Sequence, residues 1–279
     1  MSLAALRDAI NLLTTRPALW LPGFACGVLA SLLWLVAYYA GAMVAGRLVI
    51  LVLLLIIYLC AMTYSAIRKA DLTVSGITRE GASSYFRILI PVLVIAFSIF
   101  IVFILIMVTL AIIGMQADYS LLSFLTFGIM LPSIMLTYFA DCAAVFEGRK
   151  VFESIRRSIE IVTFSLFDVL LFYLTSFLIF CAISFAFFVA WTAALADQLE
   201  PLTHFNETQY ATFTPGQLAG YVGTEGVWVS AVCLFAAVSI LFPLLVTYKA
   251  CFFRQIGGTA IPIQQVTGEY DSKGRWYKY

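Results

Sequence analysis

Charged side chains at the edges of long apolar stretches are the residues of this chain best placed to do chemistry. Asp141 and Asp168 lie at such edges, and Lys249 and Arg68 lie at a similar depth on other stretches. An isolated charge is costly in hydrocarbon, so charges at this depth either pair with one another or serve a proton pathway. We expect Asp141 to pair with Lys249 or Arg68 and to hold helix ends together. A proton relay is the alternative.

The remaining reactive side chains form no catalytic signature. A metal site needs clustered ligands and a histidine mechanism needs an orienting partner, whereas this chain has one histidine, His204. The six cysteines show no C-x-x-C spacing, and we expect them to pack between helices. We therefore predict no enzyme activity, no metal and no cofactor. An enzyme acting on lipid headgroups is an alternative that requires Asp141, Asp168 and nearby arginines to converge on one pocket.

Six long uncharged stretches must position these residues. The chain of 279 residues is 63% hydrophobic and 11% charged, whereas soluble domains carry about 25% charged residues. Each stretch is long enough to cross a hydrocarbon core of about 30 Å. The predicted fold is an all-α, polytopic membrane domain over residues 1–254, followed by a tail over 255–279. Its six spans are expected at about 17–40, 48–67, 88–113, 120–140, 169–196 and 226–248.

Basic residues are distributed very unequally between the two sides of this six-span arrangement. Fifteen of the sixteen Lys and Arg residues fall on the side of the two termini, and Arg47 alone falls on the other. Basic residues near the ends of spans mark the cytoplasmic side. We expect a cell-membrane protein with cytoplasmic termini and tail. The net charge is only +1, and the basic residues are spread over several segments rather than gathered in one patch. Both facts argue against a nucleic-acid partner.

Three segments on the predicted cytoplasmic side combine an amphipathic pattern with basic residues and lead directly into a span. They cover residues 3–15, roughly 78–88, and 150–163. Such helices suit the surface of an anionic leaflet. The chain can therefore be divided into three units of an interfacial helix and a membrane hairpin. The candidate contacts to lipid headgroups are Arg7, Arg16, Arg149, Lys150, Arg156 and Arg157.

Small residues recur every fourth position on the first span, at Gly23, Gly27 and Ser31. Helices in lipid associate by close packing rather than by a hydrophobic force, and small residues let their backbones approach. We expect this face to meet another helix of the same protomer, with contact across an oligomer as the alternative.

The one long external loop, about 197–225, contains a helix start. Thr214 followed by Pro215 is typical of an N-cap with proline at the first helical position. We expect a short helix lying over the bundle as a lid or plug. In the tail, a polar turn over 271–274 between two aromatic-rich arms is consistent with a small hairpin, and a disordered tail is the alternative.

One stretch resembles a known group of proteins. The run AVFEGRKVFESIRRS, residues 144–158, places an acidic residue and glycine, an amphipathic stretch and an arginine-serine pair before a hydrophobic span. It resembles the corresponding segment in a loose superfamily of prokaryotic six-span proteins related to the membrane domain of glycerophosphodiester phosphodiesterases. The resemblance implies the six-span architecture. No soluble phosphodiesterase domain is recognisable in the sequence, so no catalytic residue carries over.

These observations favour a non-enzymatic membrane scaffold or accessory subunit. We expect it to contact membrane lipids and to form a homo-oligomer or a larger membrane complex. The alternative is a channel or carrier for a small uncharged or lipid-like solute. Such a carrier would use a cavity lined by hydroxyl-bearing side chains, namely Tyr58, Thr63, Tyr64, Ser98 and Thr175.

Overall fold

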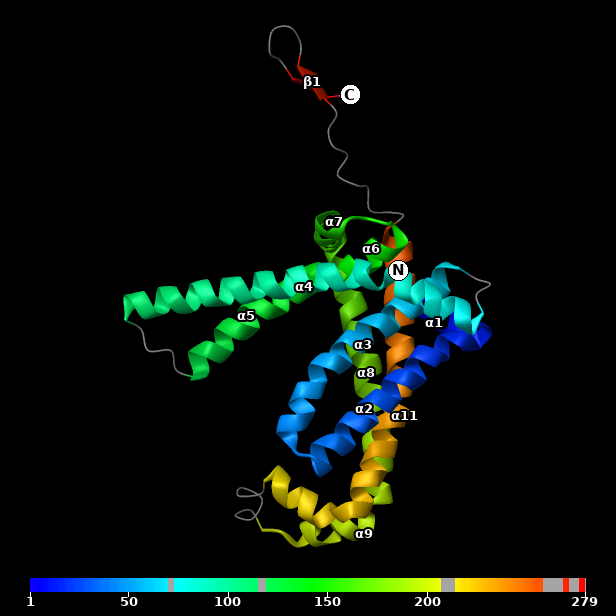
Figure 1. Cartoon of the computed structure of the whole chain (residues 1–279), viewed down its shortest axis with the longest axis vertical. Helices are drawn as coiled ribbons and strands as arrows, with labels where there is room; N and C mark the ends of the chain where they lie inside the picture. Colours follow the sequence, from blue (N-terminus) through cyan, green and yellow to red (C-terminus); the bar gives the residue numbers. More distant parts are fainter. Residues whose placement is uncertain (70–72, 115–118, 207–213, 258–267, 271–275, 279) are drawn as a thin grey trace.

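The computed structural model describes residues 1–69, 73–114, 119–206, 214–257, 268–270 and 276–278 (Figure 1). Within this part of the chain, six helices are long and apolar enough to cross a membrane. The protein is therefore a multi-pass membrane protein of the all-α class, as the composition predicts. The spanning helices are α2 (Trp20–Tyr39), α3 (Ala42–Arg68), α4 (Val74–Ile113), α5 (Tyr119–Thr137), α8 (Leu166–Ala194) and α11 (Pro215–Gly257).

Shorter elements connect and flank these helices. They are α1 (Ser2–Thr15), η1 (Pro17–Leu19), α6 (Ala140–Phe146), α7 (Val151–Phe164), α9 (Ala196–Leu199) and η2 (Glu200–His204). The amphipathic segments predicted at 3–15 and 150–163 correspond to α1 and α7. In the tail, β1 (Gly268–Tyr270) pairs antiparallel with β2 (Trp276–Lys278), which confirms the predicted hairpin. The turn between the two strands lies outside the described residues.

The middle amphipathic segment differs from the prediction because it is not a separate helix. Residues 78–88 and the following span form the single 40-residue helix α4. At 1.5 Å per residue it is about 60 Å long, roughly twice the thickness of a hydrocarbon core. Gly81 does not interrupt it, because this glycine lies against α3. A Cβ at Gly81 would be 2.6 Å from the Cγ of Met62.

The main hydrophobic core lies toward one end of the molecule, where α1, α6 and α7 meet α3, α8 and the C-terminal turns of α11. We call this the α7 end. Its centre is aromatic: the ring of Phe172 on α8 is 4.6 Å from that of Phe252 and 4.7 Å from that of Tyr248, both on α11. The opposite end, which carries α9, is called the α9 end (Figure 1).

The hairpin formed by α4 and α5 diverges from the other spans. Figure 1 shows both helices running sideways from the α7 end, whereas α2 and α8 lie along α11. Large apolar side chains on this hairpin are exposed, including Phe97 (64%), Phe124 (76%) and Phe127 (73%). Its own protomer therefore leaves much of the apolar surface of the hairpin uncovered.

The small residues on α2 pack against α11. A Cβ at Gly23 would lie 2.6 Å from Pro243, and a Cβ at Gly27 would lie 2.2 Å from the Oγ of Ser239. Two of the three residues in the predicted packing face thus meet a helix of the same protomer. Ser31 is different, because its hydroxyl donates to the carbonyl of Val28 one turn earlier on α2, at 3.0 Å.

We predict that Gly27→Ala destabilises the protein by about 1–3 kcal/mol, because the added methyl group overpacks the contact with α11. Thermal unfolding in detergent measures the change. The matched control is Gly46→Ala on α3, where a Cβ has no atom within 4 Å, and this variant should unfold at or above the wild-type temperature. Equal unfolding temperatures for the two variants would contradict the observed packing.

Candidate functional site

A buried ion pair joins three helices at the α7 end. Lys249 of α11 places its Nζ 2.7 Å from the Oδ2 of Asp141, on α6. Tyr64 of α3 donates its hydroxyl to the same oxygen at 2.8 Å. The other oxygen, Oδ1, accepts the backbone N–H of Cys142 at 2.8 Å. Both carboxylate oxygens therefore have hydrogen-bond donors.

The lysine of this pair is also well surrounded. Its Nζ lies 4.0 Å from the centre of the Tyr138 ring, in a cation–π contact. The side chains of Lys249 and Asp141 are only 10% and 13% exposed. Removing charges from water is costly, and that cost is offset only when the partners and additional hydrogen bonds are in place. The geometry is that of a structural ion pair linking helices.

Asp141 reaches this position because the helical path is interrupted just before it. Between α5 and α6, the Oγ of Ser158 on α7 accepts the backbone N–H of Phe139 at 3.0 Å and donates to the carbonyl of Leu136 at 2.8 Å. One serine thus satisfies backbone groups that the interruption leaves without helical partners. Sequence reasoning did not single out Ser158, whose fully buried side chain shows its role only in the folded chain.

The structure selects Lys249 from the two partners expected for Asp141. Arg68 instead donates from its Nη1 to the carbonyl of Val145 at 3.1 Å. Arg68 is one helical turn beyond Tyr64 on α3, so it reaches the C-terminal end of α6 rather than its start. A cation there complements the exposed carbonyls and the helix dipole. Arg68 therefore also links α3 to α6, but not through Asp141.

Arg157 was predicted to contact lipid headgroups, and its position in the structure does not fit that prediction. Its side chain is only 3% exposed, so it does not face lipid headgroups. Its Nε lies 3.2 Å from the Oε1 of Glu147, and its Nη2 donates to the carbonyl of Gly257 at 3.0 Å. On α7 it shares the buried face with Ser154 and Ile161, at helical spacing. Arg157 binds the end of α11 to α7.

The other predicted headgroup residues have varied surroundings. Arg7, Lys150 and Arg156 are exposed, and Arg156 also pairs with Glu160 at 2.9 Å. Arg16 is half-buried and donates to the carbonyl of Ala66 at 3.4 Å. A further half-buried side chain, Arg149, pairs with Glu147.

A second polar cluster, whose pairings the sequence did not predict, joins α1 to α8 and α11. The Oγ of Ser2 lies 3.0 Å from the hydroxyl of Thr175 and is also hydrogen-bonded to the hydroxyl of Tyr248. Asp168 lies 3.7 Å from the amino group of Met1, so it pairs differently from Asp141. These contacts dock α1, whose Ala5 and Ala9 are fully buried, against the spans. No local sequence pattern indicates such pairings between distant segments.

The hydroxyl groups expected to line a carrier cavity are used in separate hydrogen bonds. Tyr64 donates its hydroxyl to Asp141, and each of the other four hydroxyl groups donates to a backbone carbonyl. The donors and carbonyls are Tyr58 with Thr78, Thr63 with Leu59, Ser98 with Val94, and Thr175 with Leu171.

The ion pair does border an apolar groove. A space of about 410 Å³ lies between α4 and α5, lined by Val92, Ile99, Ile134 and Met130 among others, with Asp141 and Lys249 at its edge. His204, in contrast, lies exposed in η2. All six cysteines are free, and in the described part of the chain no three metal-ligating side chains cluster.

We predict that Lys249→Met destabilises the protein by on the order of 3 kcal/mol, because Asp141 keeps a buried charge without its cation. Combining it with Asp141→Leu should cost less than the sum of the two single changes, as a double-mutant cycle of unfolding free energies can measure.

The matched control for Lys249→Met is Arg156→Met, which removes an i,i+4 ion pair whose cation is exposed and should cost less than about 1 kcal/mol. Strictly additive effects at Asp141 and Lys249 would show that the pair does not hold the helices together.

Comparisons with known proteins identify a family but no characterised relative. No curated protein and no solved structure matches the chain. A family model described as a domain of unknown function, DUF7847, matches residues 2–256. The match runs from the start of α1 to the last turn of α11 and so includes the ion pair of Asp141 and Lys249 and the six spanning helices of the described part of the chain. The chain belongs to the DUF7847 family.

Proposed function

We propose that this protein is a non-enzymatic scaffold or accessory subunit of a membrane assembly. The observation that carries the proposal is the divergence of the α4–α5 hairpin from the remaining spans (Figure 1). The polar and aromatic contacts described above hold the remaining helices together at the α7 end, and the hairpin extends from this end. Such an arrangement presents a long helical surface to a neighbouring membrane helix.

The hairpin also carries a feature suited to helix packing. Gly128 lies in the interior of α5, and a Cβ placed there would meet no atom within 4 Å. A glycine in a helix interior costs about 1 kcal/mol relative to alanine. In lipid, however, it lets a second helix approach closely and gain dispersion contacts. We infer that another chain, either a second copy or a different subunit, packs against α5 at Gly128.

The proposed orientation is in the cell membrane with both termini cytoplasmic. It places the exposed residues Arg7, Lys150 and Arg156, which we call the basic collar, at the inner leaflet. Each basic residue near an anionic surface is worth about 1 kcal/mol. The basic collar therefore supports binding of anionic lipid.

A carrier of uncharged or lipid-like solutes is the second candidate. The groove of about 410 Å³ between α4 and α5 favours it, since an apolar chain fits beside residues such as Ile99 and Ile134. The scaffold is preferred because the expected cavity-lining hydroxyls are used in separate internal hydrogen bonds.

We predict that Gly128→Leu disrupts the assembly while leaving the unfolding temperature of the protomer nearly unchanged, because leucine fills the surface that the second helix approaches. Native mass measurement after gentle extraction from the membrane gives the particle composition. The control is Gly46→Leu, also without neighbours within 4 Å but in the first turns of α3 and outside the α4–α5 hairpin, which should leave the particle intact. A wild-type particle that is a bare monomer would refute the scaffold proposal.

We also predict that replacing Arg7, Lys150 and Arg156 together by glutamine lowers the retention of phosphatidylglycerol relative to phosphatidylcholine. The physical reason is the lost attraction between the basic collar and the anionic headgroup. Native mass spectrometry counts the retained lipids. Arg47→Gln, an exposed change on the predicted external side, serves as control and should have no effect. Unchanged phosphatidylglycerol retention in the triple variant would contradict lipid binding by the collar.

A further inference from the structure

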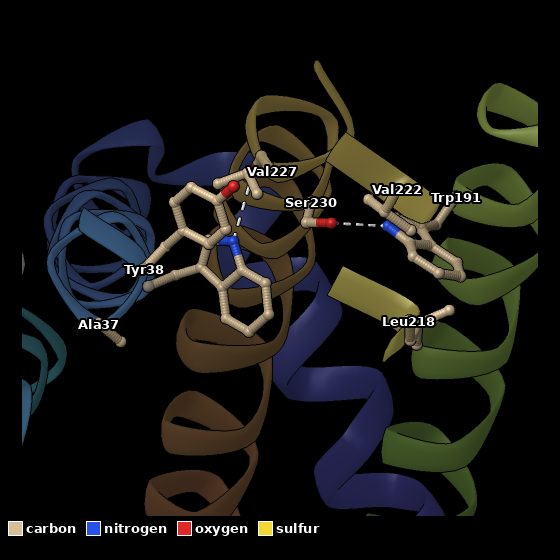
Figure 2. Close-up of a pocket in the computed structure, with 8 residues that line it drawn as sticks. Ala37, Tyr38, Trp191, Leu218, Val222, Val227 and Ser230 are labelled. Atoms are coloured by element: carbon tan, nitrogen blue, oxygen red, sulfur yellow. Dashed lines mark hydrogen bonds between the residues drawn. The ribbon is translucent and has the colours of Figure 1, made fainter. Parts of the chain in front are cut away.

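A second apolar pocket, separate from the ion pair and from the groove beside it, lies toward the α9 end. Its volume is about 330 Å³, within the range of small-molecule sites. Figure 2 shows its walls: Ala37 and Tyr38 come from α2, Trp191 from α8, and Leu218 and Val222 from the first turns of α11. Helices α2, α8 and α11 thus contribute to one space, and the first turns of α11 form a segment that covers it.

The covering segment is the start of α11, residues 215–222. The helix is broken at Gly223, whose φ of 61° and ψ of −169° are accessible essentially only to glycine. Three residues later, a Cβ at Gly226 would lie 2.0 Å from a methyl carbon of Val222. Both glycines are therefore required for the segment to turn back over the pocket. Thr214 and Gln217 cap its first turn, with the Thr214 N–H donating to the Gln217 Oε1 at 2.8 Å.

The two indole N–H groups and the serine hydroxyl of the pocket wall are already used within the protein. The Trp191 indole N–H donates to the Oγ of Ser230 at 2.8 Å, and Ser230 donates to the carbonyl of Gly226 at 2.7 Å. A second indole N–H, that of Trp34, donates to the carbonyl of Val227 at 3.3 Å (Figure 2). What these residues offer a ligand is ring faces and methyl groups. None of the described residues that line the pocket is charged.

The position of the pocket indicates where its ligand comes from. Tryptophan and tyrosine side chains concentrate at the two levels where hydrocarbon meets the headgroups. Trp34, Tyr38 and Trp191 meet here in the last turns of α2 and α8, at the ends of these helices that lie away from α1 and α7. We therefore expect this apolar pocket to lie at the membrane level where lipid tails begin.

We propose that this pocket binds the aliphatic chain of a membrane lipid from the leaflet at the α9 end, with residues 215–222 as its cover. An aliphatic chain makes no hydrogen bond, so it leaves the paired indole and hydroxyl groups undisturbed. Each buried methylene contributes favourable dispersion contact with the rings. This binding site does not depend on the scaffold proposal, because it shares no residue with α4, α5 or the basic collar.

The test uses the full-length protein in mild detergent, titrated with a phosphatidylcholine whose acyl chain carries bromine atoms. Bromine quenches indole fluorescence at short range, so a chain beside Trp34 and Trp191 should give saturable quenching. Ala37→Phe, which fills the pocket, should weaken the apparent affinity by about tenfold or more, since it excludes at least two methylene groups from burial. Ala40→Phe, an exposed change near the same helix end, should bind as the wild type does.

Two results would overturn the proposal. One is quenching that rises without saturation in the wild type, which indicates only lipid in the surrounding detergent belt. The other is equal affinity in Ala37→Phe and Ala40→Phe when both retain the wild-type helical content. If Ala37→Phe does not fold, the smaller Ala37→Leu replaces it, with Ala40→Leu as its control and a weaker apparent affinity again expected.

Discussion

The carboxylate of Asp141 is bonded at once to a lysine, a tyrosine hydroxyl and a backbone N–H, and these contacts join α3, α6 and α11. In a protein with few charges in its membrane part, such a pair is unfavourable unless every partner is present. Its geometry therefore restricts how the three helices can be rotated and shifted relative to one another. The aromatic contacts of Phe139, Phe172 and Phe252 pack beside the same junction and add to that restriction.

The α7 end is packed like the core of a soluble protein, with polar side chains bonded to neighbouring elements. Much of the rest of the protein instead exposes apolar side chains. Arg157, Ser2 and Arg68 all bond to backbone or side-chain groups of neighbouring elements at the α7 end. Away from this end, large apolar side chains face outward, as lipid allows, and association depends on small residues such as Gly27. A rigid base with a divergent hairpin follows from this unequal distribution of polar contacts. It is the physical basis for the proposed role in a larger assembly.

The two apolar spaces lie in different settings and support different ideas. The groove between α4 and α5 borders the ion pair and is lined mainly by the hairpin that leaves the bundle. The pocket near Trp191 is covered by a segment whose path two glycines determine, and so it is built by the protomer alone. A lipid chain in that second pocket would join α2, α8 and α11 without any polar contact.

The sequence by itself determined the six spans, the helix start at Thr214 and the packing role of Gly23 and Gly27, because hydropathy, capping and residue size act locally. Only the tertiary structure decided that Asp141 takes Lys249 rather than Arg68, that Arg157 is buried, and that α4 continues through the expected boundary near residue 88. It also decided that α4 and α5 leave the bundle (Figure 1). These outcomes depend on the rotation and register of helices from distant parts of the chain. Hydrophobic patterning constrains that geometry weakly in lipid, where every face of a spanning helix can be apolar.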